Sequence, residues 1–149
     1  MPQITSLIPS PTFLQKIVIL ALQAKPLRLG LIPLGSEVSP ALQETNEGGV
    51  ILVEFNGAGW LRPTITIPSL GSYNSTNKTW ALPADLQWSV TGPIGGIDVK
   101  QFFVIIEGLT TPRNTTGTFM GVSPIMASAL TIPASVAVPI KLPWTLFGA

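Results

Sequence analysis

The chain has 149 residues and a mass of 15.8 kDa, which suits one domain with a hydrophobic core of its own. It contains neither Cys nor His, which excludes disulfides, thiolate or imidazole metal ligands, and catalysis of the Ser–His or Cys–His type. Its eight basic and seven acidic side chains leave a net charge of +1, so we expect no nucleic acid and no acidic membrane as partners. Only 10% of the residues are charged, against about 25% in a typical soluble domain. We therefore expect the chain to cover part of its surface with other chains.

The N-terminal segments differ from the rest of the chain. Residues 1–11 are uncharged and contain three prolines, which predicts an extended arm. Residues 12–24 have apolar side chains at helical spacing and end before Pro26, which predicts one short N-terminal helix. The uncharged stretch 114–140 is long enough to cross a bilayer, but its three prolines argue against a spanning helix.

The remainder of the chain shows strand patterns separated by Pro, Gly and Asn turns. The predicted strands are residues 26–34, 50–55, 60–67, 85–90, 99–106, 118–122 and 130–140, with polar loops at residues 35–49, 69–78 and 110–117. This spacing predicts an all-β fold, an antiparallel β-sandwich of the jelly-roll or Ig-like type. We expect a single domain over residues 1–149, with an apolar C-terminal tail at residues 134–149.

Side-chain alternation predicts which way these strands face. In residues 26–34 the odd-numbered leucines point inward and Arg28 points outward. In residues 50–55 we expect Glu54 to point outward, and in residues 60–67 we expect Leu61 inward with Arg62 outward, because charged side chains are seldom buried. The continuous apolar run in residues 99–106 predicts a central strand buried on both faces.

No catalytic motif, cofactor motif or metal-ligand cluster is present, so we expect no enzyme and no cofactor. Two alternatives remain open. One is a carboxylate site formed by Asp85, Asp98 and Glu107, since paired carboxylates perform glycoside hydrolysis. The other is a carbohydrate-binding module whose aromatic side chains form a platform, although core and interface packing is the simpler interpretation. These aromatic residues are Trp60, Tyr73, Trp80, Trp88 and Trp144.

Two short segments resemble a known family. Residues 54–62 read Glu-Phe-Asn-Gly-Ala-Gly-Trp-Leu-Arg, and residues 109–113 read Leu-Thr-Thr-Pro-Arg, with Gly117 shortly after. Both resemble segments of small structural proteins of tailed bacteriophages, and the order of elements over residues 12–132 is also similar. The resemblance implies a β-sandwich of the virion without enzymatic activity.

On this basis the expected function is that of a virion protein that decorates and cements the capsid surface. A tail, baseplate or fibre protein, including one that binds a receptor, is the alternative. The expected partners are further copies of the chain, with a trimer favoured, and other virion proteins such as the major capsid protein. Free disordered tails are normally rich in charge and poor in large apolar residues, so we expect the termini to form interfaces. The candidate interface residues are Ile4, Leu7, Ile8, Trp144 and Phe147.

Overall fold

The computed structural model describes residues 3–4, 6–7, 10, 17, 20–39, 47–66, 72–76, 79–81 and 87–141. The side chains of residues 47–48, 72–74 and 79–81 are outside this description. The described chain is mostly β, with antiparallel pairing throughout, which confirms the all-β prediction at that level. No helix among the described residues is long and apolar enough to cross a membrane.

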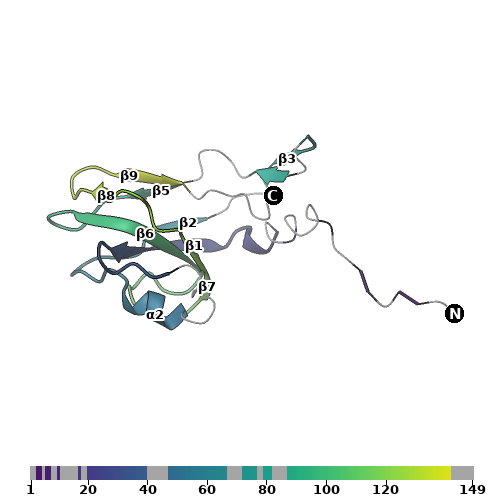
Figure 1. The fold of residues 1–149 in the computed structure, drawn as a ribbon, viewed down its shortest axis with the longest axis horizontal. Helices are drawn as coiled ribbons and strands as arrows, with labels where there is room; N and C mark the ends of the chain where they lie inside the picture. The colour runs from purple at the N-terminus through teal and green to yellow at the C-terminus, as the bar shows by residue number, and fades with distance from the viewer. Residues whose placement is uncertain are drawn as a thin grey trace.

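One large sheet and two small ones make up the fold (Figure 1). In the large sheet the strand order is β2-β1-β6-β7. Strand β8 pairs with the same edge of β6 as β7 does, but nearer the N-terminal end of β6. The small sheets are β3–β4 and β5–β9. The elements are β1 (Pro26–Pro33), α2 (Glu47–Leu52), β2 (Thr64–Thr66), β3 (Ser72–Asn74), β4 (Thr79–Ala81), β5 (Gln87–Val90), β6 (Ile97–Ile106), β7 (Thr118–Val122), β8 (Leu130–Ile132) and β9 (Val138–Lys141).

The centre of the large sheet is the antiparallel pair β1–β6, whose predicted inward and central positions are confirmed. Leu27, Leu29 and Leu31 are at most 1% exposed, and β6 lies between β1 on one edge and β7 and β8 on the other. A β-bulge at Lys100 places one extra residue in β6, between the partners of Ile32 and Pro33. Because a one-residue insertion reverses side-chain alternation, Val99 faces the same side as Val104 although their numbers differ in parity.

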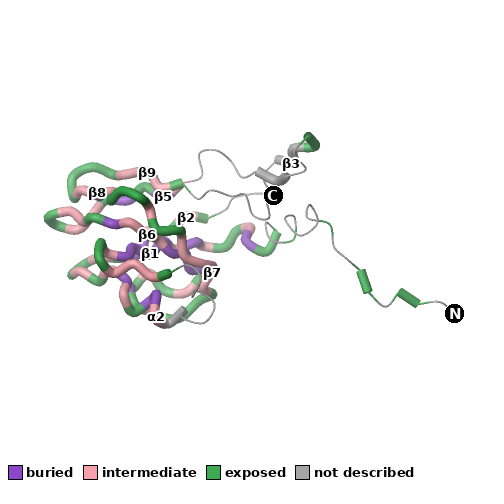
Figure 2. Tube along the Cα trace, in the orientation of Figure 1, coloured by how far each residue is buried: buried purple, intermediate pink, exposed green. Residues whose placement is uncertain are grey.

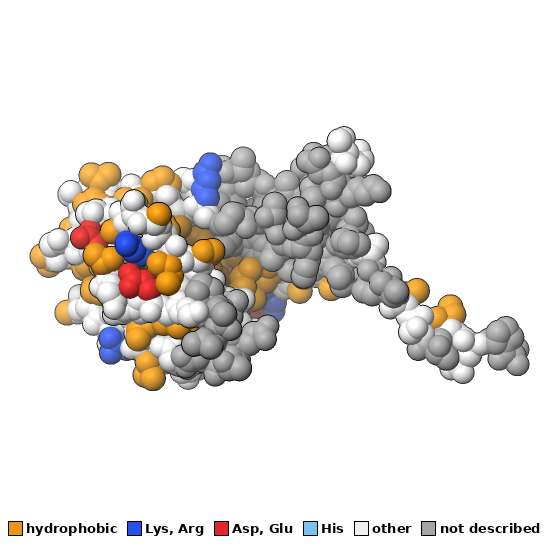
Figure 3. Space-filling view, in the orientation of Figure 1, with side chains coloured by type: hydrophobic (Ala, Val, Ile, Leu, Met, Phe, Trp, Pro, Cys, Tyr) orange, Lys and Arg blue, Asp and Glu red, His pale blue; other side chains and the backbone are white. Residues whose placement is uncertain are grey.

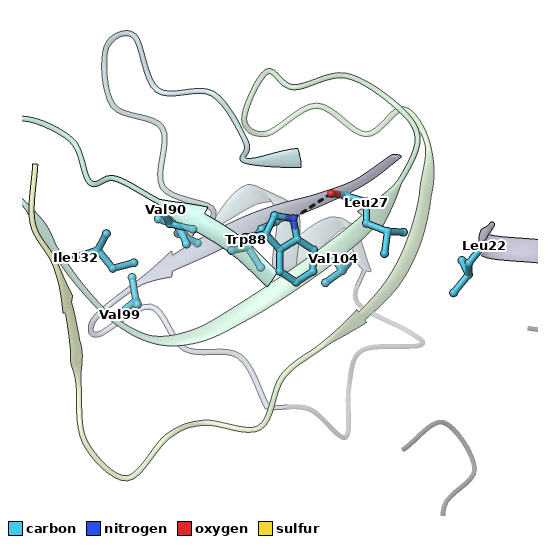
Figure 4. Packing of buried hydrophobic residues seen from close by; sticks show 9 residues of the cluster. Leu22, Leu27, Trp88, Val90, Val99, Val104 and Ile132 are labelled. Atoms are coloured by element: carbon cyan, nitrogen blue, oxygen red, sulfur yellow. Dashed lines mark hydrogen bonds between the residues drawn. The ribbon is translucent and has the colours of Figure 1, made fainter. Parts of the chain in front are cut away.

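Each face of this sheet has its own covering element (Figure 1). The β5–β9 pair covers one face, where Trp88 packs among the β1 leucines with Val99, Val104 and Ile132 (Figure 4). Helix α2 covers the other face, where Val50 and Ile51 pack on Ile32, Phe103 and Ile105. The buried residues accordingly follow β1 and β6 through the middle of the molecule (Figure 2).

The predicted strand at residues 50–55 is wrong. Residues 47–52 form α2, and the chain leaves the helix through turns in which Val53 and Glu54 donate to the carbonyls of Val50 and Ile51. The helix is favoured because Val50 and Ile51, adjacent on its surface, both reach the sheet. Glu54 was expected to face outward and is instead completely buried. The last three residues of the loop predicted at residues 35–49 are likewise helical, because α2 begins at Glu47.

The predicted strand at residues 60–67 is correct only for its second half, β2. The expected orientation of the first half is wrong, because Arg62 is 2% exposed and Leu61 is 59% exposed. Here the chain follows β1 without strand pairing: Leu29 donates to the carbonyl of Pro63, and Arg62 donates to that of Thr110. Side chains need not alternate between two faces in an extended segment that is not a strand of the sheet. Arg62 can therefore be buried and Leu61 exposed without loss of strand pairing.

The remaining differences concern ends and loops. The loop predicted at residues 69–78 contains strand β3, and the strand predicted at residues 130–140 is divided into β8 and β9 by residues 133–137. The tail predicted at residues 134–149 therefore begins inside the fold, since β9 pairs with β5. Residues 142–149 lie outside the described residues. Of the predicted helix at residues 12–24, positions 17 and 20–22 are helical, and Ala24 adopts a left-handed turn with φ of 62°.

Candidate functional site

A buried ion pair lies where α2, the approach to β2 and the loop after β6 meet. Glu54 and Arg62 have fully buried side chains, and Nη2 of Arg62 lies 2.7 Å from Oε1 of Glu54. Nε of Arg62 donates to Oε2 of Glu54 at 2.8 Å, so the contact is bidentate. This geometry fixes the guanidinium plane as well as the charge, which a lysine would not do.

The loop after β6 completes this network. Nη1 and Nη2 of Arg62 also donate to the carbonyls of Leu109 and Asn114, and the backbone N–H of Arg113 donates to Oε1 of Glu54. Arg113 adopts a left-handed conformation with φ of 60°, which directs its N–H to the carboxylate while its Nε donates to the carbonyl of Glu54. Burial of two charges requires such partners, because an unpaired buried charge costs several kcal/mol, roughly 3–5.

This network joins two segments that the sequence analysis singled out, residues 54–62 and 109–113. Glu54 and Arg62 are the first and last residues of the first segment, and residues 109–113 are the second. Between Glu54 and Arg62 the chain turns at Ala58 and Gly59, and the backbone N–H of Trp60 donates to the carbonyl of Gly57. The role of these residues in this chain is therefore to hold three stretches of backbone together. The contacts of Glu54 and Arg62 within the network leave neither side chain exposed to a ligand.

The three carboxylates considered as a hydrolytic site do not all come together. Asp98 lies near the start of β6 and Glu107 just after its end, so the length of the strand separates them. Oδ1 of Asp98 accepts a hydrogen bond from Thr131, and Glu107 pairs with Lys25. Asp85 lies outside the described residues. Among the residues that the structure describes, no three Asp or Glu side chains are grouped as a metal site.

The aromatic residues are also divided. Trp88 is 1% exposed and its Nε1 donates to the carbonyl of Leu27, so it belongs to the core (Figure 4). Trp60 packs edge-on against Phe55 at a centroid distance of 5.6 Å and is half-buried. The side chains of Tyr73 and Trp80, and all of Trp144, lie outside the description. Trp88 therefore contributes nothing to a surface platform for sugars.

An apolar groove opens between β7 and the end of β9. Its volume is about 230 Å³, and its floor consists of Leu29, Phe102 and Val104 from the large sheet. Trp88 and Ile140 line it from the β5–β9 sheet and Met120 lines it from β7, and Ser123 and Lys141 are its polar lining side chains. Sequence patterns did not indicate this groove. It depends on how far the two-stranded β5–β9 sheet extends across the larger sheet.

The candidate interface residues are only partly described. Ile4 and Leu7 are 81% and 83% exposed and lie away from the sheets (Figure 1). Ile8, Trp144 and Phe147 lie outside the described residues. Large apolar side chains are also exposed on the body of the molecule, and the face in Figure 3 shows many of them with few charges between. They include Leu34, Leu52, Leu61, Ile94, Leu109, Ile125 and Val136.

Comparison of the chain with protein-family models, with curated proteins and with solved structures finds no match.

Proposed function

We propose that the chain is a structural protein of a tailed-phage virion and that it binds the outer surface of the capsid. One observation carries this proposal: the chain has few charged residues, and its uncharged N-terminal arm exposes the apolar side chains of Ile4 and Leu7. Isolated monomers rarely keep such residues in water, whereas subunits of an assembly bury them against neighbours. The resemblance of residues 54–62 and 109–113 to phage structural proteins supports the same assignment.

The β5–β9 sheet lying on the large sheet supports a β-sandwich of the jelly-roll or Ig-like type as the underlying fold. Sandwiches provide a rigid body from which loops and termini reach partners. The expected assembly is a homo-oligomer, with a trimer favoured. Sedimentation of a clean monomer at high concentration would contradict it.

The copy number per particle is the direct test of location. Quantitative mass spectrometry of purified virions is expected to find several hundred copies, because a capsid lattice repeats its surface sites many times. A dozen copies or fewer would favour the alternative, a tail, baseplate or fibre protein. Absence from purified particles would overturn the virion proposal.

Truncation tests the role of the C-terminal residues. Removing residues 142–149 leaves β9 whole, because this strand ends at Lys141. The truncated protein is expected to stay folded by circular dichroism and to lose binding to capsids from which the full chain has been stripped. The double variant Trp144→Ala/Phe147→Ala should reproduce most of this loss, since buried aromatic residues dominate interface energies. Unfolding of the truncated protein would instead assign these residues to the protein's own core.

A further inference from the structure

We propose that the apolar groove between β7 and β9 receives the N-terminal arm, residues 3–8, of a second copy of the chain. The arm would lie along the outer edge of β9 as an added strand. The proposal concerns contacts between copies, so it does not depend on which surface of a virion the protein binds.

The groove forms because the β5–β9 sheet is narrower than the large sheet that it covers. The large sheet is four strands wide, whereas the sheet above it has two, and β5 contacts β2 near one edge of the large sheet. Strand β9 therefore faces the β6–β7 side, and the groove is lined by Ile140 from β9 and by Met120 from β7. In the part of the chain that the structure describes, β9 pairs only with β5. An extended segment beside β9 would fill the groove. Pro139 within β9 has no N–H, so pairing with that edge would use the carbonyls of β9 and the N–H groups of its other residues.

The arm has the chemistry that this groove requires. Residues 1–11 contain no charged side chain, and six extended residues span about 20 Å. Residues 3–8 contain no proline, so each of them has a backbone N–H to donate. The groove lining is also mainly apolar, with Lys141 at its end as the charged lining residue.

A second copy is the favoured source of this segment. In each copy Ile4 and Leu7 are more than four-fifths exposed, and the described residues near the N-terminus lie away from that copy's own sheets (Figure 1). Exchange between copies buries Ile4 in the groove without refolding of the body, whereas Leu7, three positions further, faces the opposite side of the added strand. It also covers Phe102 and Met120, which are partly buried core neighbours in the single chain.

Cysteine cross-linking tests this arrangement, and the chain is suited to it because it contains no cysteine. The variants Ile4→Cys and Met120→Cys are purified separately, with tags of different size, mixed and mildly oxidised. We expect a disulfide-linked heterodimer, since the bond forms only when the two Cα atoms come within about 7 Å. The matched control replaces Ile4→Cys by Ile94→Cys, a fully exposed apolar position on the turn before β6.

A second measurement uses charge. The double variant Ile4→Asp/Ile8→Asp should raise the dissociation constant of the oligomer at least about tenfold in sedimentation equilibrium, because positions 4 and 8 lie on the same face of an added strand and each Asp opposes transfer into an apolar groove. Ile94→Asp/Ile125→Asp adds the same charge at two exposed positions outside the groove lining and should leave the constant unchanged. Thermal unfolding of the unchanged protein and of the two double variants shows that each is folded.

Three results would overturn the proposal. The first is a heterodimer no more abundant than that of the Ile94→Cys control. The second is a cross-link of Met120→Cys to Phe147→Cys in place of Ile4→Cys, which would give the groove to residues 142–149. The third is an unchanged dissociation constant for the Asp double variant in the arm.

Discussion

The variant Arg62→Met removes one partner of the buried ion pair and keeps a long apolar side chain in its place. The Glu54 carboxylate then retains the N–H of Arg113 but loses its countercharge and two hydrogen bonds. The carbonyls of Leu109 and Asn114 lose the guanidinium as a donor. The chain provides its own control in Lys25→Met, because the Lys25–Glu107 pair has the same 2.7 Å separation of nitrogen and oxygen.

The two variants are expected to differ strongly because their pairs differ in burial. The side chains of Lys25 and Glu107 are 46% and 52% exposed, and exposed pairs contribute about 1 kcal/mol or less. Both side chains of the Glu54–Arg62 pair are fully buried, and removing one partner of such a pair costs about 3–5 kcal/mol. Against a total stability of about 5–15 kcal/mol this is a large fraction. It corresponds to a fall in Tm of roughly 6–20 °C for a chain of this size.

Urea unfolding followed by tryptophan fluorescence, to which the buried Trp88 contributes, measures this difference. The midpoint of Arg62→Met should fall well below that of Lys25→Met, with an unchanged slope, because both proteins expose the same surface when they unfold. Arg62→Lys should lie between them, since it keeps the charge and loses the bidentate geometry. Equal midpoints for Arg62→Met and Lys25→Met would refute the conclusion that the buried pair holds these segments together.

Three further outcomes follow from local geometry. Gly30→Ala should lower stability by about 1–3 kcal/mol in the same assay, because a Cβ at this position would lie 2.1 Å from the ring of Phe103, which is itself buried. Ile105→Asp should prevent folding, as judged by soluble expression, since it places an unpaired charge in the core beneath α2; a well-folded variant would show that β6 is misplaced. The backbone N–H groups of Glu37 itself and of Gly35 lower the pKa of the Glu37 carboxyl below its usual 4.5. The ionised carboxyl therefore stabilises the folded state above pH 4.5, and this stabilisation is lost as the pH falls through the pKa of the folded state. Glu37→Gln should remove this part of the acid dependence, measured by unfolding between about pH 2 and 6.

Sequence patterns were sufficient to predict the two strands at the centre of the fold. Alternation predicted β1 and a continuous apolar run predicted β6, because the β5–β9 pair and α2 cover the two faces of the sheet that these strands form. Residues 50–55 were assigned wrongly because the short apolar run at residues 50–53 fits a buried strand and a buried helix equally well. The bulge at Lys100 has no sequence signal either, since it depends on the register of the partner strand.

The buried ion pair was missed for a physical reason. Single charged residues beside apolar ones are normally solvent-exposed, so sequence reasoning placed Glu54 and Arg62 on the surface. Their burial depends on Arg113 and on the carbonyls of Leu109 and Asn114, which are 47 to 59 residues distant in sequence. The segments that contain these residues were singled out by the resemblance, but nothing in their spacing shows that they meet. The groove was missed because sheet width is a property of the assembled fold.

The same network bears on the kinetics of folding. Glu54 and Arg62 are only eight residues apart, whereas the carbonyls and the N–H that complete their burial come from beyond β6. Until that loop docks, both charges remain hydrated and the pair adds little. We expect these contacts to form after the main barrier has been crossed, in which case their removal accelerates unfolding and leaves the folding rate almost unchanged. The ion pair would then slow unfolding much more than it speeds folding. Its main effect would be a longer lifetime of the folded protein.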